Sequence, residues 1–143
     1  MKKILLIEDD PLMLKILQSR LSDEQEAEFL TAIHPEEGLQ KAQSELPDVI
    51  LLDLVFPETA GLELMQTLKK NQKTKSIPVI VLTILGRDDI IEKAMRYGAA
   101  DAIIKGDISL EELIGRVKMF LGNPLRGENP MTIAYVSKFK EGI

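Results

Sequence analysis

The sequence predicts an α/β protein built on an open, doubly wound parallel sheet of five strands. Five short apolar runs recur along the chain, and helical patterns separate them. Strands that alternate with helices are typical of a parallel sheet with right-handed crossovers. Five such units in about 120 residues, roughly 24 residues each, suit an open sheet and fall short of an eight-unit barrel.

Each strand is predicted from an apolar run bounded by turn signals. The first and third runs are continuous, as in strands buried on both faces of a sheet. The fourth begins at Ile77-Pro78, and the second is the weakest because only part of it is apolar. The predicted strands are 4–7, 26–31, 49–52, 79–82 and 102–104.

Capping signals place the first two helices behind their strands. Asp10 before Pro11 is a typical N-cap followed by proline at the first helical position. His34-Pro35-Glu36-Glu37 opens the second helix, because proline and acidic residues favour the first turn of a helix. We expect the apolar stripe of the first helix to face the core; its residues are Leu12, Ile16, Leu17 and Leu21.

The later helices are predicted from periodicity and capping together. A helix with Leu62, Met65 and Leu68 on one face follows the third strand, and the pattern at 87–97 predicts a fourth helix that ends at Gly98. A serine at 109 and a glutamate three residues later form a capping box for the last helix, about 110–121.

Length and composition favour a single domain. The 143 residues carry a formal net charge of −5, which argues against broad binding of nucleic acid. We expect residues 1–122 to form the domain, because Gly122-Asn123-Pro124 ends the regular pattern. Residues 123–143 are expected to be a C-terminal tail or linker, and three roles stay open for them: packing on the domain, dimerisation, or connection to an effector domain.

Several classes of protein are excluded or disfavoured by residue counts. Cysteine is absent, which excludes disulfides, thiolate metal sites and cysteine nucleophiles, and the lone His34 cannot make a histidine-rich metal site. Only four apolar residues, 4–7, follow the basic N-terminus, too few for a signal peptide or a membrane span. A cytoplasmic protein is therefore expected.

Polar residues end four of the five apolar runs. Because the carboxyl ends of parallel strands meet at one edge, where open α/β sheets place their ligand crevice, these residues are expected to share one pocket. That pocket would hold carboxylates, a hydroxyl and an ammonium. The residues are Glu8-Asp9-Asp10, Asp53, Thr83 and Lys105.

This set of side chains suits phosphoryl chemistry supported by a metal. Converging carboxylates repel one another, and a hard divalent cation relieves the repulsion; oxygen ligands alone favour Mg²⁺. A carboxylate such as Asp53 can act as nucleophile towards a phosphoryl donor. Lys105 could pair with Asp53 or with the phosphoryl group, and Thr83 could donate a hydrogen bond to a phosphoryl oxygen.

Over residues 1 to about 122, the chain resembles the receiver domain of two-component response regulators. The family has a flavodoxin-like fold with strand order 2-1-3-4-5, takes part in phosphorelays and is regulatory rather than enzymatic, apart from self-catalysed phosphorylation and dephosphorylation. The segments that carry the resemblance are 4–11, 53–57 with Gly61, 81–83, Gly98-Ala99 and Lys105.

The resemblance implies a role for each pocket residue. Asp53 would be the phosphoacceptor that forms an aspartyl phosphate, Thr83 the switch hydroxyl and Lys105 the lysine that pairs with the phosphoryl group. The ligands implied for Mg²⁺ are Asp9 directly, Glu8 largely through water, Asp53, and the backbone carbonyl of Val55.

The resemblance also implies partners. A sensor histidine kinase or a phosphotransfer protein would supply the phosphoryl group, and a downstream protein or a missing effector domain would receive the signal. A homodimer through the fourth helix, fifth strand and fifth helix is possible. Direct contact with nucleic acid or membrane is not expected of this domain.

Two positions depart from the family pattern. Ala102 stands three residues before Lys105, where the family usually has an aromatic residue that couples phosphorylation to the output surface. Tyr97 is the nearest aromatic in sequence. Gly106 replaces the usual proline after a cis peptide bond, so we expect a trans or looser loop there.

Two other functions and several structural roles compete with this interpretation. The chain could be a receiver-like scaffold that works without phosphorylation, or a flavin or nucleotide enzyme, although the acidic loop after the first strand would repel phosphate. In structural terms, Asp10 would be mainly a helix cap, and Lys69-Lys70 would lie on a solvated helix face.

Overall fold

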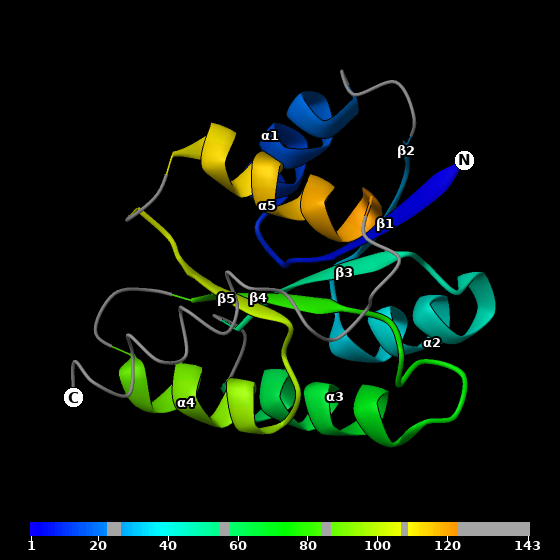
Figure 1. Ribbon diagram of the computed structural model, residues 1–143, viewed down its shortest axis with the longest axis vertical. Helices are drawn as coiled ribbons and strands as arrows, with labels where there is room; N and C mark the ends of the chain where they lie inside the picture. The colour runs from blue at the N-terminus through cyan, green and yellow to red at the C-terminus, as the bar shows by residue number, and fades with distance from the viewer. Residues whose placement is uncertain (23–26, 55–57, 84–86, 107–108, 123–143) are drawn as a thin grey trace.

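Five parallel strands form one sheet that helices cover on both faces in a computed structural model of the protein (Figure 1). The structure describes residues 1–22, 27–54, 58–83, 87–106 and 109–122. The strands are β1 (Lys2–Ile7), β2 (Ala27–Ala32), β3 (Val49–Asp53), β4 (Val79–Thr83) and β5 (Asp101–Ile104). The helices are α1 (Pro11–Ser22), α2 (Pro35–Glu45), α3 (Glu58–Lys70), α4 (Asp88–Arg96) and α5 (Leu110–Gly122).

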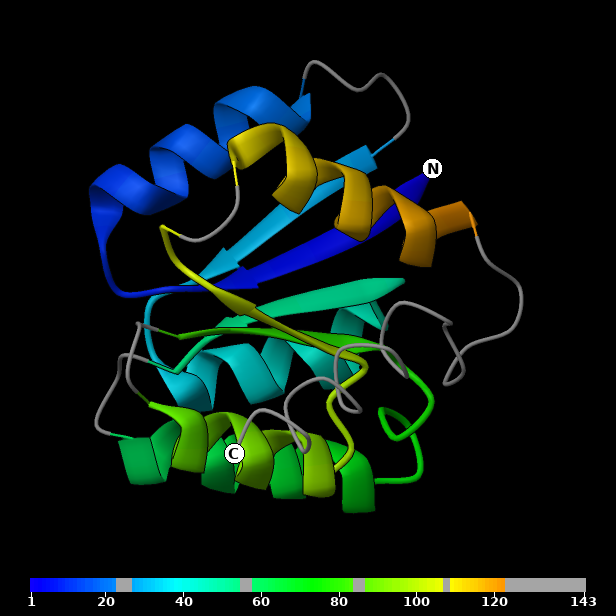
Figure 2. The same ribbon diagram turned by 60° about the vertical axis from the view of Figure 1, so that its left-hand side comes forward.

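The strand order is β2-β1-β3-β4-β5, which confirms the predicted fold. The order reverses at β1, which pairs with β2 on one side and β3 on the other. Ile7 lies opposite Leu52, so Glu8 and Asp53 end two neighbouring strands. In Figure 2 the arrowheads of β1 and β2 point the same way, towards the edge at which these polar residues lie.

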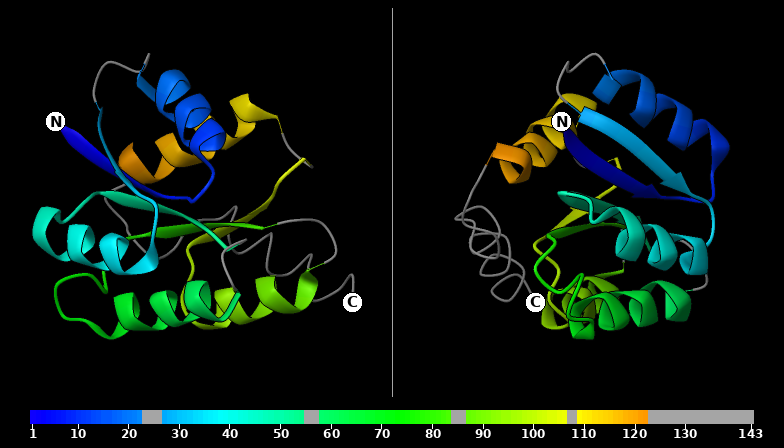
Figure 3. Two further views of the ribbon diagram at one scale, coloured as in Figure 1. Left: turned by 180° about the vertical axis from the view of Figure 1, so that it is seen from behind. Right: turned by 90° about the vertical axis from the view of Figure 1, so that its right-hand side faces the viewer.

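Two apolar cores lie on the two faces of the sheet. Helices α1 and α5 cover one face, and α2, α3 and α4 cover the other (Figures 1 and 3). Along β1, Leu5 and Ile7 face the three-helix side, whereas Ile4 and Leu6 face the two-helix side. Burial on both faces explains why the central strands are uninterrupted apolar runs.

The predicted capping interactions are present at three helix ends. The Asp10 carboxylate accepts the backbone N–H of Leu12 at 3.0 Å, and the Ser109 hydroxyl accepts that of Glu112 at 3.1 Å. Gly98 follows α4 with a φ of 106°, where a side chain would be strained. Asp10 is therefore a helix cap, as expected.

The predicted core stripe of α1 is partly wrong. Leu12 is 65% exposed and Ile16 is 40% exposed, whereas Leu17 is buried. Helix α1 shares its face of the sheet with α5, so the sheet covers only a narrow strip of α1, and that strip includes Leu17, Met13 and Leu14. The side chain of Leu21 lies outside the described residues.

Lys69 also differs from its expected solvated position. Its Nζ donates hydrogen bonds to the backbone carbonyls of Ile77 at 2.7 Å and Lys75 at 3.3 Å. The turn between α3 and β4 brings these carbonyls to the end of the helix. Lys70, in contrast, is exposed as predicted.

The remaining expectations concern loops and the tail. The described residues hold no cis peptide bond, and Gly106 has a φ of 91°. No helix among the described residues has both the length and the apolar character to cross a bilayer. Val55 and residues 123–143 lie outside the described residues, so the predicted division at residue 122 stays a prediction.

Candidate functional site

The candidate site lies where β1 and β3 end side by side. Beyond β1, the Glu8 N–H donates to the carbonyl of Ala32 at 3.0 Å, which continues the hydrogen bonding with β2 by one residue. Glu8 is 2% exposed and Asp53 is 1% exposed. The sheet therefore fixes two carboxylates in a buried position where apolar strands end.

Three carboxylates converge at this point. Glu8, Asp9 and Asp53 each offer an oxygen, and these oxygens lie within 4.8 Å of one another. Asp9 is exposed, so the cluster opens to solvent on its side. The structure thus brings Asp53 together with two acids, Glu8 and Asp9, that lie more than forty residues earlier in the sequence.

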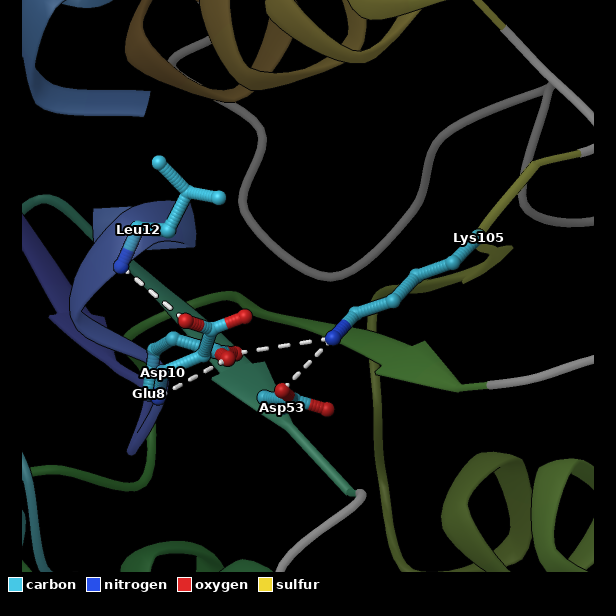
Figure 4. Close-up of polar contacts among 5 residues, drawn as sticks. All are labelled: Glu8, Asp10, Leu12, Asp53 and Lys105. Atoms are coloured by element: carbon cyan, nitrogen blue, oxygen red, sulfur yellow. Dashed lines mark hydrogen bonds and ion pairs between the residues drawn. The ribbon is translucent and has the colours of Figure 1, made fainter. Parts of the chain in front are cut away.

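Lys105 reaches into the cluster from the end of β5 (Figure 4). Its Nζ donates to Asp53 Oδ2 at 2.7 Å and lies 3.7 Å from Glu8 Oε2. Its backbone N–H donates to the carbonyl of Thr83 at 2.8 Å, which holds the lysine beside the end of β4. One ammonium is therefore shared by two buried carboxylates.

Thr83 ends β4 next to the phosphoacceptor candidate. Asp53 pairs with Leu82, so Thr83 is one residue farther along the neighbouring strand. The threonine is 2% exposed. Its register places it at the same edge of the sheet as Asp53 and Lys105.

The charged form of Glu8 is poorly stabilised by its surroundings. Its Oε2 atom is buried and accepts no hydrogen bond, while Oε1 accepts the N–H of Asp10 at 3.3 Å. Burial first, and then the neighbouring Asp53 carboxyl, raise the pKa of Glu8 from 4.5 to about 8, although Lys105 opposes the rise. A buried carboxylate oxygen without a partner is costly, and a cation would relieve that cost.

The donor set fits a hard divalent cation. All three side chains offer carboxylate oxygens, neither sulfur nor imidazole is present in the cluster, and the exposed Asp9 leaves room for water ligands. Asp9, Asp53 and Glu8 are the residues that would hold Mg²⁺. The predicted fourth ligand, the backbone carbonyl of Val55, lies outside the described residues.

A second buried acid, which the sequence analysis did not single out, lies away from this site. Asp101 begins β5, accepts the N–H of Ala102 at 2.8 Å and lies 3.5 Å from the guanidinium of Arg116 in α5. Burial raises its pKa, and Arg116 opposes the rise. The sequence signal for Asp101 was its place directly before an apolar strand. Its partner Arg116 could not be predicted, because their contact depends on how α5 packs on the sheet.

Ala102, at the position where the family usually has an aromatic residue, is buried. The residue is fully buried, pairs with Val81 of β4 and belongs to the core on the three-helix side. Tyr97, at the end of α4, packs against the same core and is only partly buried.

Comparison with known proteins identifies the family of the chain and agrees with its fold. A sequence profile described as the response regulator receiver domain matches residues 4–118. The chain belongs to this family. The polar-differentiation response regulator DivK of Brucella ovis is 31% identical over 125 residues, which cover 85% of this chain and 98% of that protein.

Solved receiver domains have the same architecture. The phosphorylated cyanobacterial phytochrome response regulator RcpA is 27% identical, with a TM-score of 0.73 over 89% of this chain and 99% of that one. A signal receiver domain of a histidine kinase from Syntrophus aciditrophicus is 29% identical, with a TM-score of 0.76 over 90% and 96% of the two chains.

Membership of the receiver domain family fixes the general role of the chain. Receiver domains are regulatory modules of two-component signalling that interact with histidine kinases or phosphotransfer proteins and with downstream targets. They bind Mg²⁺ or Mn²⁺ at an acidic pocket, and this chain has a cluster of acidic residues formed by Glu8, Asp9 and Asp53.

Proposed function

We propose that this protein is a phosphorylation-controlled switch in which Asp53 accepts the phosphoryl group. A sensor histidine kinase or a phosphotransfer protein supplies that group, and the phosphorylated domain changes its contacts with a downstream partner. The observation that carries the proposal is the setting of Asp53: a buried carboxylate, 2.7 Å from the Lys105 ammonium and grouped with two further acids.

Asp53 is the nucleophile in this proposal. One carboxylate oxygen of Asp53 forms a bond to phosphorus as the bond to the donor breaks, and the donor leaves with the electron pair. Lys105 donates a hydrogen bond to Asp53 Oδ2 at 2.7 Å and so holds the carboxylate in position before transfer. Bound Mg²⁺ supplies charge neutralisation beside the phosphoryl oxygens, held by Asp9, Asp53 and Glu8, with the Val55 carbonyl as a further ligand.

Lys105 and Thr83 would bind the phosphoryl group on Asp53. A phosphoryl oxygen on Asp53 offers the Lys105 ammonium a stronger partner than the carboxylate alone, so the ion pair is expected to re-form around the phosphoryl group. The Thr83 hydroxyl, at the end of the adjacent strand, is the proposed hydrogen-bond donor to a second oxygen. Both residues therefore couple the ends of β4 and β5 to the state of Asp53.

The proposed output face consists of α4, β5 and α5. Helices α4 and α5 follow β4 and β5 in the chain. The ends of these two strands are joined by the hydrogen bond from the Lys105 N–H to the Thr83 carbonyl. A homodimer through this face is one form that the output could take. Position 102 is an alanine, so it has no aromatic ring that could rotate into the core. In this proposal the structural change on phosphorylation therefore reaches the output face through the backbone and α4.

A phosphorylation assay tests the proposal. The protein is incubated with Mg²⁺ and acetyl phosphate, and a mass gain of one phosphoryl group on Asp53 is expected, together with binding of a fluoroberyllate mimic. Asp53→Asn should show neither, and Asp10→Asn, which alters a helix cap outside the carboxylate cluster, should retain both. A wild-type protein with no gain and no bound mimic would contradict the proposal.

The scaffold alternative makes a different prediction about partner binding. If the domain works without phosphate, a partner should bind wild type and Asp53→Ala with equal affinity whether or not a phosphodonor is present. Our proposal expects the phosphodonor to change the affinity of the wild-type protein alone.

A further inference from the structure

The C-terminal end of α3 holds a lysine in an unusual setting, at the opposite edge of the sheet from the acidic pocket. The Nζ of Lys69 bonds the carbonyls of Ile77 and Lys75, and the side-chain stem lies against Gly98, where an added Cβ would be 3.2 Å from Lys69 Cγ. Lys69 thus contacts α3, the α3–β4 turn and the turn after α4. Helices α3 and α4 run side by side beneath the sheet (Figure 3).

The Nζ of Lys69 has two carbonyl oxygens as its hydrogen-bond acceptors. A neutral amine can supply both hydrogen bonds and still keep its lone pair, which is the form that reacts with an acyl donor. Within the described part of the chain, no carboxylate lies within ion-pair distance of this Nζ, unlike those of Lys2, Lys3, Lys41 and Lys105. Burial lowers the pKa of Lys69 from 10.5 to about 8.

Three exposed lysines follow Lys69 closely in the sequence. Lys70, Lys73 and Lys75 are exposed, and none of them makes an ion pair within the described residues. The turn that carries them is ordered, since the Thr74 hydroxyl donates to the Leu68 carbonyl at 2.7 Å and the Asn71 side chain accepts the Lys73 N–H at 2.8 Å. We call Lys70, Lys73 and Lys75 the lysine turn.

Charges on the facing helix do not neutralise the lysine turn. The last turn of α4 contributes Lys93 and Arg96, and Arg96 is already paired with Glu92 at 2.7 Å. The region around Lys69 is therefore positive in a chain whose net charge is −5. A small anion that approaches this edge of the sheet is attracted to it.

We propose that Lys69 is an N-acylation site for small anionic acyl donors, namely acyl phosphates and acyl thioesters of coenzyme A. The lysine turn attracts the phosphate groups of the donor, and the half-buried Nζ attacks the acyl carbon. A bond forms from nitrogen to that carbon, and the bond to the phosphate oxygen or to the thiolate sulfur breaks with its electron pair on the leaving group. The surplus Nζ proton passes to water.

Acylation would loosen the junction that Lys69 holds. An amide nitrogen keeps one N–H, so at most one of the two carbonyl bonds survives, and the acyl group adds volume beside Gly98. The turn after α4 leads directly into β5, so the modification acts on the proposed output face from the side opposite Asp53.

Competition between two adjacent lysines tests the proposal. The full chain is incubated at pH 7.5 in EDTA with acetyl phosphate in one arm and acetyl-CoA in the other. Cleavage after glutamate leaves Lys69 and Lys70 on one peptide, in which fragment masses locate the acetyl group. We expect Lys69 to react about tenfold faster than Lys70, because its larger neutral fraction outweighs its lower basicity.

Variants separate the amine from its surroundings. Lys69→Arg should lose the fast signal alone, and Asp53→Asn should retain it, so failure of phosphorylation and failure of acylation are distinguishable. A Lys73→Gln/Lys75→Gln double variant should slow the reaction of Lys69 with anionic donors but not with uncharged acetic anhydride. A faster reaction in one arm alone assigns the donor class; a Lys69 that reacts no faster than Lys70 in both arms overturns the proposal.

Discussion

Asp53 and Asp101 are buried carboxylates that each face a cation, yet their surroundings differ. Asp53 shares one ammonium with Glu8, and the exposed Asp9 adds a third acid. Asp101 has the Arg116 guanidinium as its cation, and its second oxygen accepts a backbone N–H. The first group has more negative charge than it can neutralise, whereas the second is balanced. Excess charge, rather than burial alone, distinguishes the site for which we propose a ligand.

Replacement of Asp53 should have the largest effect on the difference between the two sites. Asp53→Asn should abolish phosphoryl uptake, because the amide is not a nucleophile towards phosphorus. Mass spectrometry after treatment with acetyl phosphate and Mg²⁺ measures the loss. Asp101→Asn is the matched variant, and it should still accept the group; equal uptake by wild type and Asp53→Asn would show that Asp53 is not the acceptor.

Breaking the balanced pair should instead reduce stability. Asp101→Ala leaves Arg116 without its buried partner and the Ala102 N–H without its acceptor, so we expect a loss of about 3 kcal/mol in the free energy of unfolding. Urea denaturation measures it. Glu92→Ala, which breaks the exposed pair with Arg96, should cost less than about 0.5 kcal/mol. A similar cost for the two variants would mean that Asp101 is not a stabilising residue.

Titration should reveal the excess charge through Glu8. Its folded pKa of about 8 exceeds its ordinary value of 4.5, so between these values the folded state binds more protons than the unfolded state. In metal-free solution, the contribution of Glu8 to stability should therefore be fully present below pH 4.5 and be lost as pH rises towards 8, by at most about 1.4 kcal/mol per pH unit.

The amide variant supplies the control for that titration. Glu8→Gln cannot ionise, so its unfolding free energy should change less between pH 5 and pH 7 than that of wild type. Parallel urea titrations at several pH values compare the two proteins. Identical pH dependence would place the origin of the slope in another group.

A divalent cation should produce the smallest of these effects and the most specific one. Mg²⁺ at about ten times its dissociation constant should stabilise the fold by about 1.4 kcal/mol, since it binds the folded state alone. Thermal denaturation with and without Mg²⁺ measures the shift. Asp9→Asn should remove most of it and Asp10→Asn should not, whereas a shift that survives in Asp9→Asn would exclude Asp9 as a ligand.

The sequence was sufficient for the sheet and for the acids at its edge. Apolar runs that end in Glu8, Asp53 and Lys105 predict both the strands and their meeting point, because strand direction alone sets which ends share an edge. The exposure of Leu12 could not be predicted from the sequence. Periodicity defines an apolar stripe on a helix but not how much of that stripe the sheet covers. The carbonyls around Lys69 come from a turn whose path the sequence pattern did not fix.

The pairing of β1 with β3 also bears on when the pocket can form during folding. Glu8 and Asp53 become neighbours only after the chain has completed α1, β2 and α2 and β3 has paired with β1. A nascent chain that has produced β1, α1 and β2 holds none of the pairing that brings the acids together. Cation binding is thus expected to report on the pairing of β1 with β3, and a rapid-mixing experiment could use it to time that step of folding.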